Sequence, residues 1–462
     1  MKTTSVKSAA MFSASSRMDA PYYLNEAVAY YAGLEKCPYD VTNVRDESER
    51  VFFGNIFSRR FVATSDHGMP YLRASEIQKA DLCDGNLYLA KEQANELSNL
   101  QLKKGWILVT CSGSLGSCVF SDARFEKLIG THDLIRIVPR RRHLSPEALF
   151  AFLASKYGYA TLTHSQYGSV ILHTNPEQVQ SIRIPVFPDD IQERVSELID
   201  KAVKLRESGD AAITAALEIF NSYLKTKPLP RVMMIGSDSA SGIASRNIRF
   251  DAQFVLGTKK LREEFEREKV SFRPLVEFTK SIFIGNRGKR IYTKQGIAFL
   301  TTSAALQANP MRSARTISRK NPGLESFIVH RDDILISRSG TVDTVGHVSI
   351  VGDDIAETAV SDDAIRVVID SSRISPYYVY AYLRTKLAKS NLEHLAYGSA
   401  ILHINEPLVG GLLIPILPKQ AMQQIEELSR SYREKYARAA SHENEAIRMI
   451  EREIESWQGG GE

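Results

Sequence analysis

The stretch Tyr167-Gly168-Ser169-Val170-Ile171-Leu172-His173 recurs 230 residues later as Tyr397-Gly398-Ser399-Ala400-Ile401-Leu402-His403, and six of the seven residues are identical. The stretch Ile184-Pro185-Val186-Phe187-Pro188 recurs at the same spacing as Ile414-Pro415-Ile416-Leu417-Pro418. An ordered internal repeat of this kind decides the architecture before any single element is considered. The chain is therefore predicted to contain two copies of one module.

Three further motifs recur in the same order, with small changes of spacing that indicate loops of different length. They are Arg17-Met18-Asp19-Ala20 with Arg249-Phe250-Asp251-Ala252, Ile107 to Gly113 with Ile334 to Gly340, and Leu144-Ser145-Pro146 with Ile374-Ser375-Pro376. The copies run from about Arg17 to Thr226 and from about Arg249 to Trp457. The segment between them is rich in Pro, Gly and Ser, which is typical of a linker.

Within each copy the sequence predicts a mixed α and β globule followed by a long helix. Trp106 to Thr110 and Asp333 to Ser337 have the composition of strands. Ser145 and Ser375, each followed by Pro, are typical helix N-caps. After Pro188 and Pro418, about 40 residues carry apolar side chains at helical spacing: Ile191, Val195, Leu198, Ala202, Leu205 and Ala212, then Ile425, Leu428, Tyr432, Tyr436, Ile447, Ile450 and Ile454.

A helix of that length spans roughly 60 Å and needs a partner along most of it. The spacing of three and four residues is the coiled-coil pattern, and in a duplicated chain the other copy supplies an antiparallel partner related by a pseudo-two-fold axis. The alternative is that each apolar stripe packs only on its own globule.

The predicted fold class is α+β, with two tandem globules and two long paired helices. We expect a first globular domain over residues 1–187, a first long helix over 188–227, a linker over 228–246, a second globular domain over 247–417 and a second long helix over 418–458. At 462 residues, with 43% hydrophobic and 24% charged residues, the composition is that of a folded globular protein.

The sequence lacks the motifs of several common enzyme classes. It has no Asn- or Asp-Pro-Pro-aromatic motif of an adenine methyltransferase, no acidic residue two places before Lys as in common nucleases, and no phosphate-binding GxxxxGK[ST] loop. Cys37, Cys83, Cys111 and Cys118 show neither zinc-finger spacing nor a disulfide framework. We therefore expect no catalytic site, no metal and no cofactor, and we assign the recurring His173 and His403 a structural role.

The location of the protein is also predicted from composition. No apolar run approaches the length of a membrane span, and residues 1–16 lack the apolar core of a signal peptide. A cytoplasmic protein without membrane contact is expected. The formal net charge of +5 permits a phosphate-binding face without requiring one.

The motifs together resemble type I restriction-modification specificity subunits over nearly the whole chain: an Arg-x-Asp-Ala opening, a strand leading into Ser-Gly-Ser or Ser-Gly-Thr, a Tyr-Gly-Ser element, an Ile-Pro-x-x-Pro segment and a long helix, all twice. One departure concerns a Gln that the family often has near the helix start, because Gln192 and Gln420 lie at different distances from the preceding Pro.

The resemblance implies a division of labour. Each globule would be a target recognition domain, the paired helices would fix the distance between the two, and two DNA adenine methyltransferase subunits would dock on the helices, with a motor-nuclease subunit joining in some complexes. The partner would be double-stranded DNA carrying a bipartite site with half-sites about 34 Å apart. The copies differ most between the motifs, so the site would be asymmetric.

Candidate DNA contacts are cations and small polar side chains on loops, since these are the groups that bind phosphates and base edges. In the two copies, Asn55, Arg59 and Arg60 match Asn286, Lys289 and Arg290. The alternative is that these residues form only a solvated basic surface. The Ser-Gly turns are the second group, with a plain tight turn as the alternative. The full set is Asn55, Arg59, Arg60, Ser112, Ser114, Asn286, Lys289, Arg290, Arg312, Arg315, Arg338, Ser339 and Thr341.

The Tyr-Gly-Ser elements either approach the DNA backbone or dock the globule onto the helices. Three functions compete with the principal interpretation. They are a specificity factor of another phage-defence system with a different effector, a scaffold that binds proteins through its coiled coil and not DNA, and an enzyme with an unrecognised site.

Overall fold

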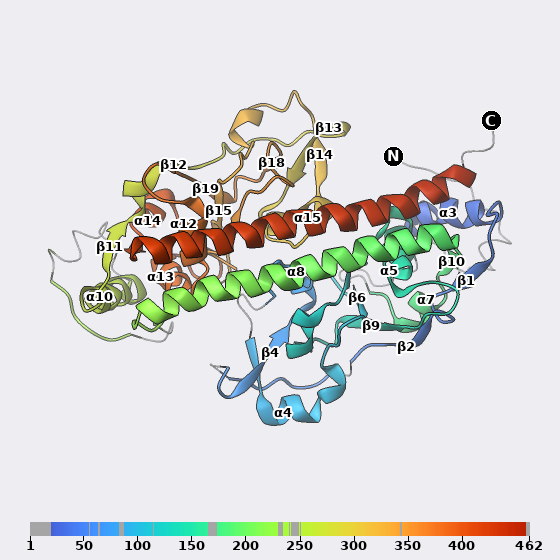
Figure 1. Ribbon diagram of the computed structural model, residues 1–462, viewed down its shortest axis with the longest axis horizontal. Coiled ribbons are helices and arrows are strands. Elements are labelled where there is room, and N and C mark those ends of the chain that lie inside the picture. The colour runs from blue at the N-terminus through green and yellow to red at the C-terminus, as the bar shows by residue number, and fades with distance from the viewer. Residues whose placement is uncertain are drawn as a thin grey trace. The chain divides into compact units, whose positions relative to one another are not determined.

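The computed structural model describes residues 20–54, 56–62, 65–82, 87–113, 115–164, 173–229, 234–239, 241, 249, 251–341 and 344–458. It divides into two compact units. The first comprises residues 1–207 and 441–462, and the second comprises residues 208–440. Each unit therefore combines one globule with a part of each long helix (green and red in Figure 1). Below, each unit is described by itself.

The first unit is a mixed α and β globule. Its helices and strands are α2 (Ala20–Tyr23), α3 (Glu26–Leu34), β1 (Val41–Asn43), β2 (Ser48–Phe52), β3 (Phe61–Val62), β4 (Gly68–Leu72), β5 (Leu87–Ala90), α4 (Lys91–Glu96), β6 (Ile107–Thr110), β7 (Cys118–Phe120), β8 (Ile129–Gly130), β9 (Leu134–Pro139), α5 (Pro146–Ala154), α6 (Lys156–His164), α7 (Pro176–Gln180), β10 (Arg183–Pro185) and the first part of α8 (Asp189–Tyr223).

The second unit has a similar but not identical order of elements. It contains α10 (Ala252–Glu266), β11 (Ser271–Pro274), β12 (Thr279–Ile284), β13 (Tyr292–Leu300), α11 (Thr302–Ala305), β14 (Arg315–Ile317), β15 (Ile334–Ser337), β16 (Ser339–Gly340), β17 (Val348–Ile350), β18 (Ala359–Val360), β19 (Ala364–Ile369), α12 (Pro376–Leu383), α13 (Lys386–Leu395), β20 (Leu402–His403), α14 (Glu406–Gly410), β21 (Leu413–Ile416) and the first part of α15 (Lys419–Gln458).

The sheet topology confirms the duplication. A four-stranded sheet has the order β2-β9-β6-β7 in the first unit and β12-β19-β15-β17 in the second. Each unit also pairs the strand before this sheet with the strand before the long helix, β1 with β10 and β11 with β21. A second sheet contains one parallel pair in each unit, β4 with β8 and β13 with β18. The predicted α+β class is therefore confirmed.

The predicted strands at Trp106 to Thr110 and Asp333 to Ser337 are the central strands β6 and β15. All four residues of each strand are buried, which explains why they read as continuous apolar runs instead of alternating patterns. Ser145 caps α5 as predicted, accepting a hydrogen bond from the Ala148 amide. Ser375 precedes α12 at the same position, but its hydroxyl makes no cap hydrogen bond.

A buried arginine occupies the same place in both units. Arg136 on β9 and Arg366 on β19 are each 0% exposed. Arg136 donates to the carbonyls of Leu134 at 2.8 Å and Gly130 at 2.9 Å, and Arg366 donates to the carbonyls of Ala364 at 3.2 Å and of residues Phe327 and Val360. Burial lowers the pKa of Arg136 to about 10 and also lowers the pKa of Arg366.

These guanidinium groups join the two sheets of each unit. Each arginine lies on the four-stranded sheet and binds carbonyls of the second sheet, at Gly130 on β8 and Val360 on β18. Each also lies 5.9 Å from the ring centroid of a phenylalanine on the neighbouring edge strand, Phe52 or Phe283. Removing the arginine would take a charged donor away from carbonyls that are buried with it, although the Phe327 carbonyl also accepts from the Val360 amide.

The long helices lie close to the predicted ranges: α8 has 35 residues and α15 has 40. In the first unit, Val195, Ile199 and Val203 of α8 share a core with Ile450 and Ile454 of α15, and Arg206 forms a buried ion pair with Glu443 at 2.7 Å. In the second unit, the Tyr436 hydroxyl donates to Asp210 at 2.9 Å. Within each unit the helix segments are thus in contact, and a coiled coil along their full length stays a prediction.

The buried arginine gives a test of the fold. We expect Arg366→Met to lower the free energy of unfolding of the second unit by about 3 kcal/mol, because buried carbonyls lose their donor. Denaturant unfolding combined with hydrogen exchange of peptides from each unit measures this. The control is Arg262→Met at an exposed position of α10. Equal unfolding midpoints for the two variants would contradict the role given to Arg366.

Candidate DNA interface

The first part of the candidate interface is the loop that follows the edge strand of each four-stranded sheet. We call it the basic loop, residues 53–60 after β2 and residues 285–291 after β12. The Arg59 guanidinium lies 5.6 Å from the ring centroid of Tyr71, and that of Arg290 lies 5.2 Å from the ring centroid of Phe299. Tyr71 and Phe299 occupy equivalent strands, β4 and β13. Arg59 and Arg290 are therefore structural equivalents.

This equivalence corrects the register predicted from sequence, which paired Arg60 with Arg290 and Arg59 with Lys289. With Arg59 on Arg290, the preceding Gly54-Asn55 falls on Gly285-Asn286 without a gap. Arg60 then corresponds to Ile291, and Lys289 corresponds to Ser58. The sequence alone favoured the wrong register because both loops contain two adjacent cations.

The second part is the short segment before β9 and β19, which we call the connector, residues 131–133 and 361–363. Arg59 Nη2 donates to His132 Nδ1 at 2.7 Å, and Arg290 forms an ion pair with Asp362. A guanidinium can only donate, so Nδ1 of His132 accepts and the ring proton sits on Nε2, which lies 3.4 Å from Asp133 Oδ1. In both units the connector holds the arginine of the basic loop.

The third part is the Ser-Gly turn, residues 111–113 and 338–341, and it also contacts the connector. The Cys111 amide donates to the Asp133 carbonyl at 3.2 Å, and the Arg338 amide donates to the Asp363 carbonyl at 2.9 Å. The connector therefore brings the two groups of predicted DNA contacts together in each unit.

The hydroxyl of the Ser-Gly turn has a structural partner. Ser339 Oγ is hydrogen-bonded to His403 Nδ1 at 2.9 Å, and Ser112 forms a β-bridge with His173. Tyr397 and His403 exchange backbone hydrogen bonds, and the Arg249 guanidinium lies 5.7 Å from the Tyr397 ring centroid. The Arg-x-Asp-Ala, Ser-Gly and Tyr-Gly-Ser motifs of the second unit thus form one cluster.

The remaining predicted residues occupy different places. Asn55 and Ser114 lie outside the described residues, as does the element Tyr167-Gly168-Ser169. Lys289, Asn286 and Thr341 are exposed, and Arg60 is exposed on the basic loop. Arg315 begins β14 with its guanidinium 5.6 Å from the Tyr292 ring centroid, next to the basic loop. Arg312 is half-buried on a short 3-10 turn.

Sequence reasoning missed two features around the basic loops. Residues 278–324 contain nine Lys and Arg residues and no Asp or Glu, a signal that a count of charge along the chain would have found. Exposed apolar side chains also lie on or beside the basic loops, including Ile56 at 85% and Tyr292 at 49% exposure. A run of cations without acids favours binding of a polyanion.

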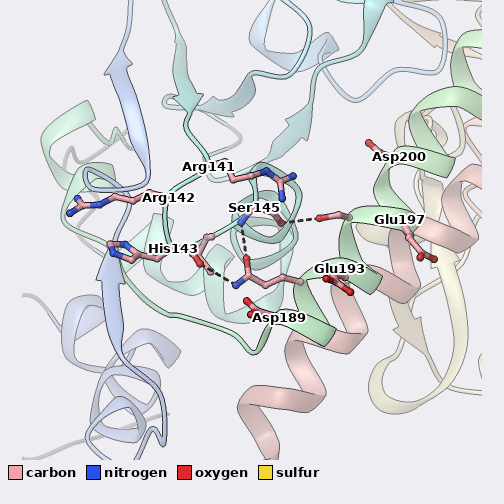
Figure 2. Close-up of a pocket in the computed structure, with 11 residues that line it drawn as sticks. Arg141, Arg142, His143, Ser145, Asp189, Glu193, Glu197 and Asp200 are labelled. Atoms are coloured by element: carbon pink, nitrogen blue, oxygen red, sulfur yellow. Dashed lines mark hydrogen bonds between the residues drawn. The ribbon is translucent and has the colours of Figure 1, made fainter.

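A second polar site lies where α8 begins. A cavity of about 490 Å³ lies between the loop at residues 141–145 and the first turns of α8. Figure 2 shows Arg141, Arg142 and His143 on the loop and a row of acidic side chains on α8: Asp189, Glu193, Glu197 and Asp200.

Two buried side chains hold the loop in place. Gln192 Nε2 donates to the carbonyls of His143 and Phe187, and its Oε1 accepts from the Ser145 amide. Glu47 accepts from the amides of His143 and Leu144. Although burial opposes its ionisation, hydrogen bonds from the His143 ring, the Thr42 hydroxyl and these two amides hold the pKa of Glu47 below its usual value. The second copy has Met422 at the position of Gln192, and Gln420 is an exposed residue at a different position. Gln192 and Gln420 are therefore not equivalent, which is why they lie at different distances from the preceding Pro.

The two helix starts differ in charge. Residues 189–200 carry five acids and one arginine, whereas residues 419–430 carry two acids and two cations. Glu197 pairs with Arg194 and Lys201, whereas Asp189, Glu193 and Asp200 form no ion pair within the described part of the first unit. The start of α8 is therefore an acidic surface without a counterpart on α15.

Three further observations concern metal sites, thiols and membrane spans in the described part of the chain. No group of three His, Cys, Asp or Glu side chains there is arranged to hold a metal ion. Cys37, Cys111 and Cys118 are free thiols, and burial raises the pKa of Cys111 to about 12. None of the helices in the described ranges has the length and apolarity of a membrane span.

The Ser339 to His403 hydrogen bond gives a test of the Ser-Gly turn. We expect Ser339→Ala to lower the free energy of unfolding by about 1 kcal/mol, because one hydrogen bond is removed. The affinity for duplex DNA should stay unchanged if the hydroxyl serves the turn alone. Thermal unfolding and binding titrations at several salt concentrations measure both. A lower affinity for DNA without loss of stability would assign Ser339 to the DNA instead.

Three solved structures resemble this chain over most of their length. The type I restriction-modification S subunit from M. genitalium is 11% identical, covers 91% of this chain and 96% of its own, and has a TM-score of 0.32. The HsdS subunit from Thermoanaerobacter tengcongensis is 14% identical, with coverage of 91% and 97% and a TM-score of 0.28.

A third similar solved structure comes from a study of complex assembly in the type I R-M system. It is 13% identical, covers 92% of this chain and 97% of its own, and has a TM-score of 0.29. No curated protein matches the sequence. Residues 52–217 match the family described as the type I restriction modification DNA specificity domain. This part of the chain therefore resembles a type I restriction-modification specificity domain.

Proposed function

We propose that this chain is the non-catalytic DNA-recognition subunit of a type I restriction-modification complex, and that it reads a bipartite asymmetric site. One observation carries the proposal. Both units build the same frame, in which the connector holds an arginine of the basic loop beside the Ser-Gly turn, while the loops on that frame differ in sequence. A common frame with different loops is what two readers of different half-sites require.

The charge of the basic loops supports double-stranded DNA as the ligand. Arg60 and Lys289 are exposed, and no ion pair engages either side chain among the described residues. Such cations bind phosphates and release counterions, which makes binding depend on salt. In the second unit the acid-free run of residues 278–324 adds further cations around the loop.

The long helices support the role of a spacer. Helices of 35 and 40 residues correspond to roughly 52 and 60 Å, more than the roughly 34 Å of one DNA turn that separates two major-groove readers. Paired as predicted, they would fix the distance between half-sites and provide the docking surface for two DNA adenine methyltransferase subunits. A motor-nuclease subunit would join the same assembly.

The acidic start of α8 is the proposed docking surface for one methyltransferase subunit. Its carboxylates fit a basic patch on the partner. We expect Glu193→Lys with Asp200→Lys to weaken assembly with the methyltransferase while DNA binding by the chain is retained or increased. Size-exclusion chromatography of the mixed subunits measures assembly, and Glu263→Lys on α10 serves as the control. Unimpaired assembly of the double variant would exclude this surface.

The basic loops give a direct test of DNA binding. We expect Arg60→Glu with Lys289→Glu to weaken binding of duplex DNA and to reduce the slope of log K against log salt by about 2, because each replaced cation no longer neutralises a phosphate. Arg262→Glu on α10 is the matched control. A scaffold that does not bind DNA predicts no salt-dependent affinity in the unaltered chain.

The proposed function is tested by expressing the chain with the methyltransferase encoded beside it and mapping methylated adenines across a host genome. A split motif with a fixed spacer, absent when the chain is omitted, is the expected result. A stable complex without new methylation would favour a specificity factor with another effector.

A further inference from the structure

The basic loops have a fixed base and a different tip in each unit. Gly54 and Gly285 stand at the base, where a Cβ atom would lie 2.4 Å from Leu100 Cδ2 or 2.8 Å from the Ser326 carbonyl oxygen. Arg59 and Arg290 close the other side, stacked on an aromatic ring and bound to the connector. Between these anchors lie Ile56-Phe57-Ser58 in the first unit and Arg287-Gly288-Lys289 in the second.

The first residue of each tip has a largely exposed side chain. Ile56 is 85% exposed, and within the described part of the two basic loops no other large apolar side chain approaches this value. Phe57, by contrast, packs against the cluster of Tyr71, Leu89 and Leu100. Ile56 therefore contributes little packing energy to its own unit, and its side chain is accessible to a ligand.

Arg287 occupies the position of Ile56 in the second unit. Its side chain is 74% exposed, and its Nε lies 4.0 Å from Asp362 Oδ2. Asp362 on the connector is itself held by Arg290. The acid therefore attracts the inner side of the Arg287 guanidinium while the outer nitrogens remain available. Arg287 is followed by Gly288, where a Cβ would meet nothing closer than 3.8 Å, so the neighbouring backbone does not crowd the arginine.

We infer that Ile56 and Arg287 are specificity-determining residues of the two half-sites. Resting on the proposed function, this assigns a base to each tip: Ile56 contacts the methyl group of a thymine, and Arg287 donates two hydrogen bonds to O6 and N7 of a guanine. These are the major-groove partners that an apolar side chain and a forked guanidinium fit best. Equivalent positions on one frame thus read different bases.

The experiment selects duplexes from a randomised pool with the complex of the chain and its methyltransferase, and sequences the bound fraction. We expect Arg287→Ile to lose a guanine preference at one position of one half-site, with the enrichment ratio falling about 5- to 150-fold. The other half-site should be unchanged. Ile56→Arg should replace a thymine preference by guanine in that other half-site. Arg262→Ile on α10 is the control.

The variant Arg287→Lys separates base reading from phosphate binding, because lysine keeps the charge without the fork. We expect it to lose the guanine preference while keeping the salt dependence. Unchanged preferences in Arg287→Ile, or a uniform loss of affinity for all sequences with a smaller salt slope, would overturn the inference. If the unaltered complex selects no motif, the proposed function itself fails. Equal thermal unfolding of the variants shows that each still folds.

Discussion

The two buried guanidinium groups of Arg136 and Arg366 are the constraint on which each globule depends. A buried cation is costly unless hydrogen bonds compensate for the lost water, and here backbone carbonyls of the second sheet provide them. The arginine therefore fixes the residues that lead into the connector. Because the connector in turn holds the basic loop and the Ser-Gly turn, the position of both candidate contact groups follows from one buried charge.

The residues of the repeated motifs form contacts inside the unit, and they are not the residues proposed to contact bases. Asp251 of the Arg-x-Asp-Ala motif caps α10, and Arg249 beside it donates to the carbonyls of Leu395 and Ala396 at the end of α13. Ser339 and His403 tie two motifs that lie 64 residues apart. Residues identical in both copies are thus engaged inside the unit, which leaves the residues that differ free to face a ligand.

The basic loop and the start of α8 are two surfaces of the first unit that differ in charge. The basic loop presents cations and an exposed apolar tip, as expected of a surface that meets a polyanion with base edges. The start of α8 presents carboxylates, which would repel DNA phosphates and fit a basic protein surface. Under the proposed function, the nucleic acid and the protein partner would therefore bind to different surfaces of the same unit.

The sequence by itself determined the duplication, the two long helices and the central strands, because repeats and periodicity are local patterns that can be read without knowing contacts. It also placed the basic loops, although in the wrong register. Only the tertiary structure decided that Arg59 matches Arg290, that Arg136 and Arg366 join the sheets, and that Ser339 is engaged by His403. These facts depend on which distant segments pack together, and two adjacent cations in a loop look alike until one of them is seen to stack on a ring and bind the connector.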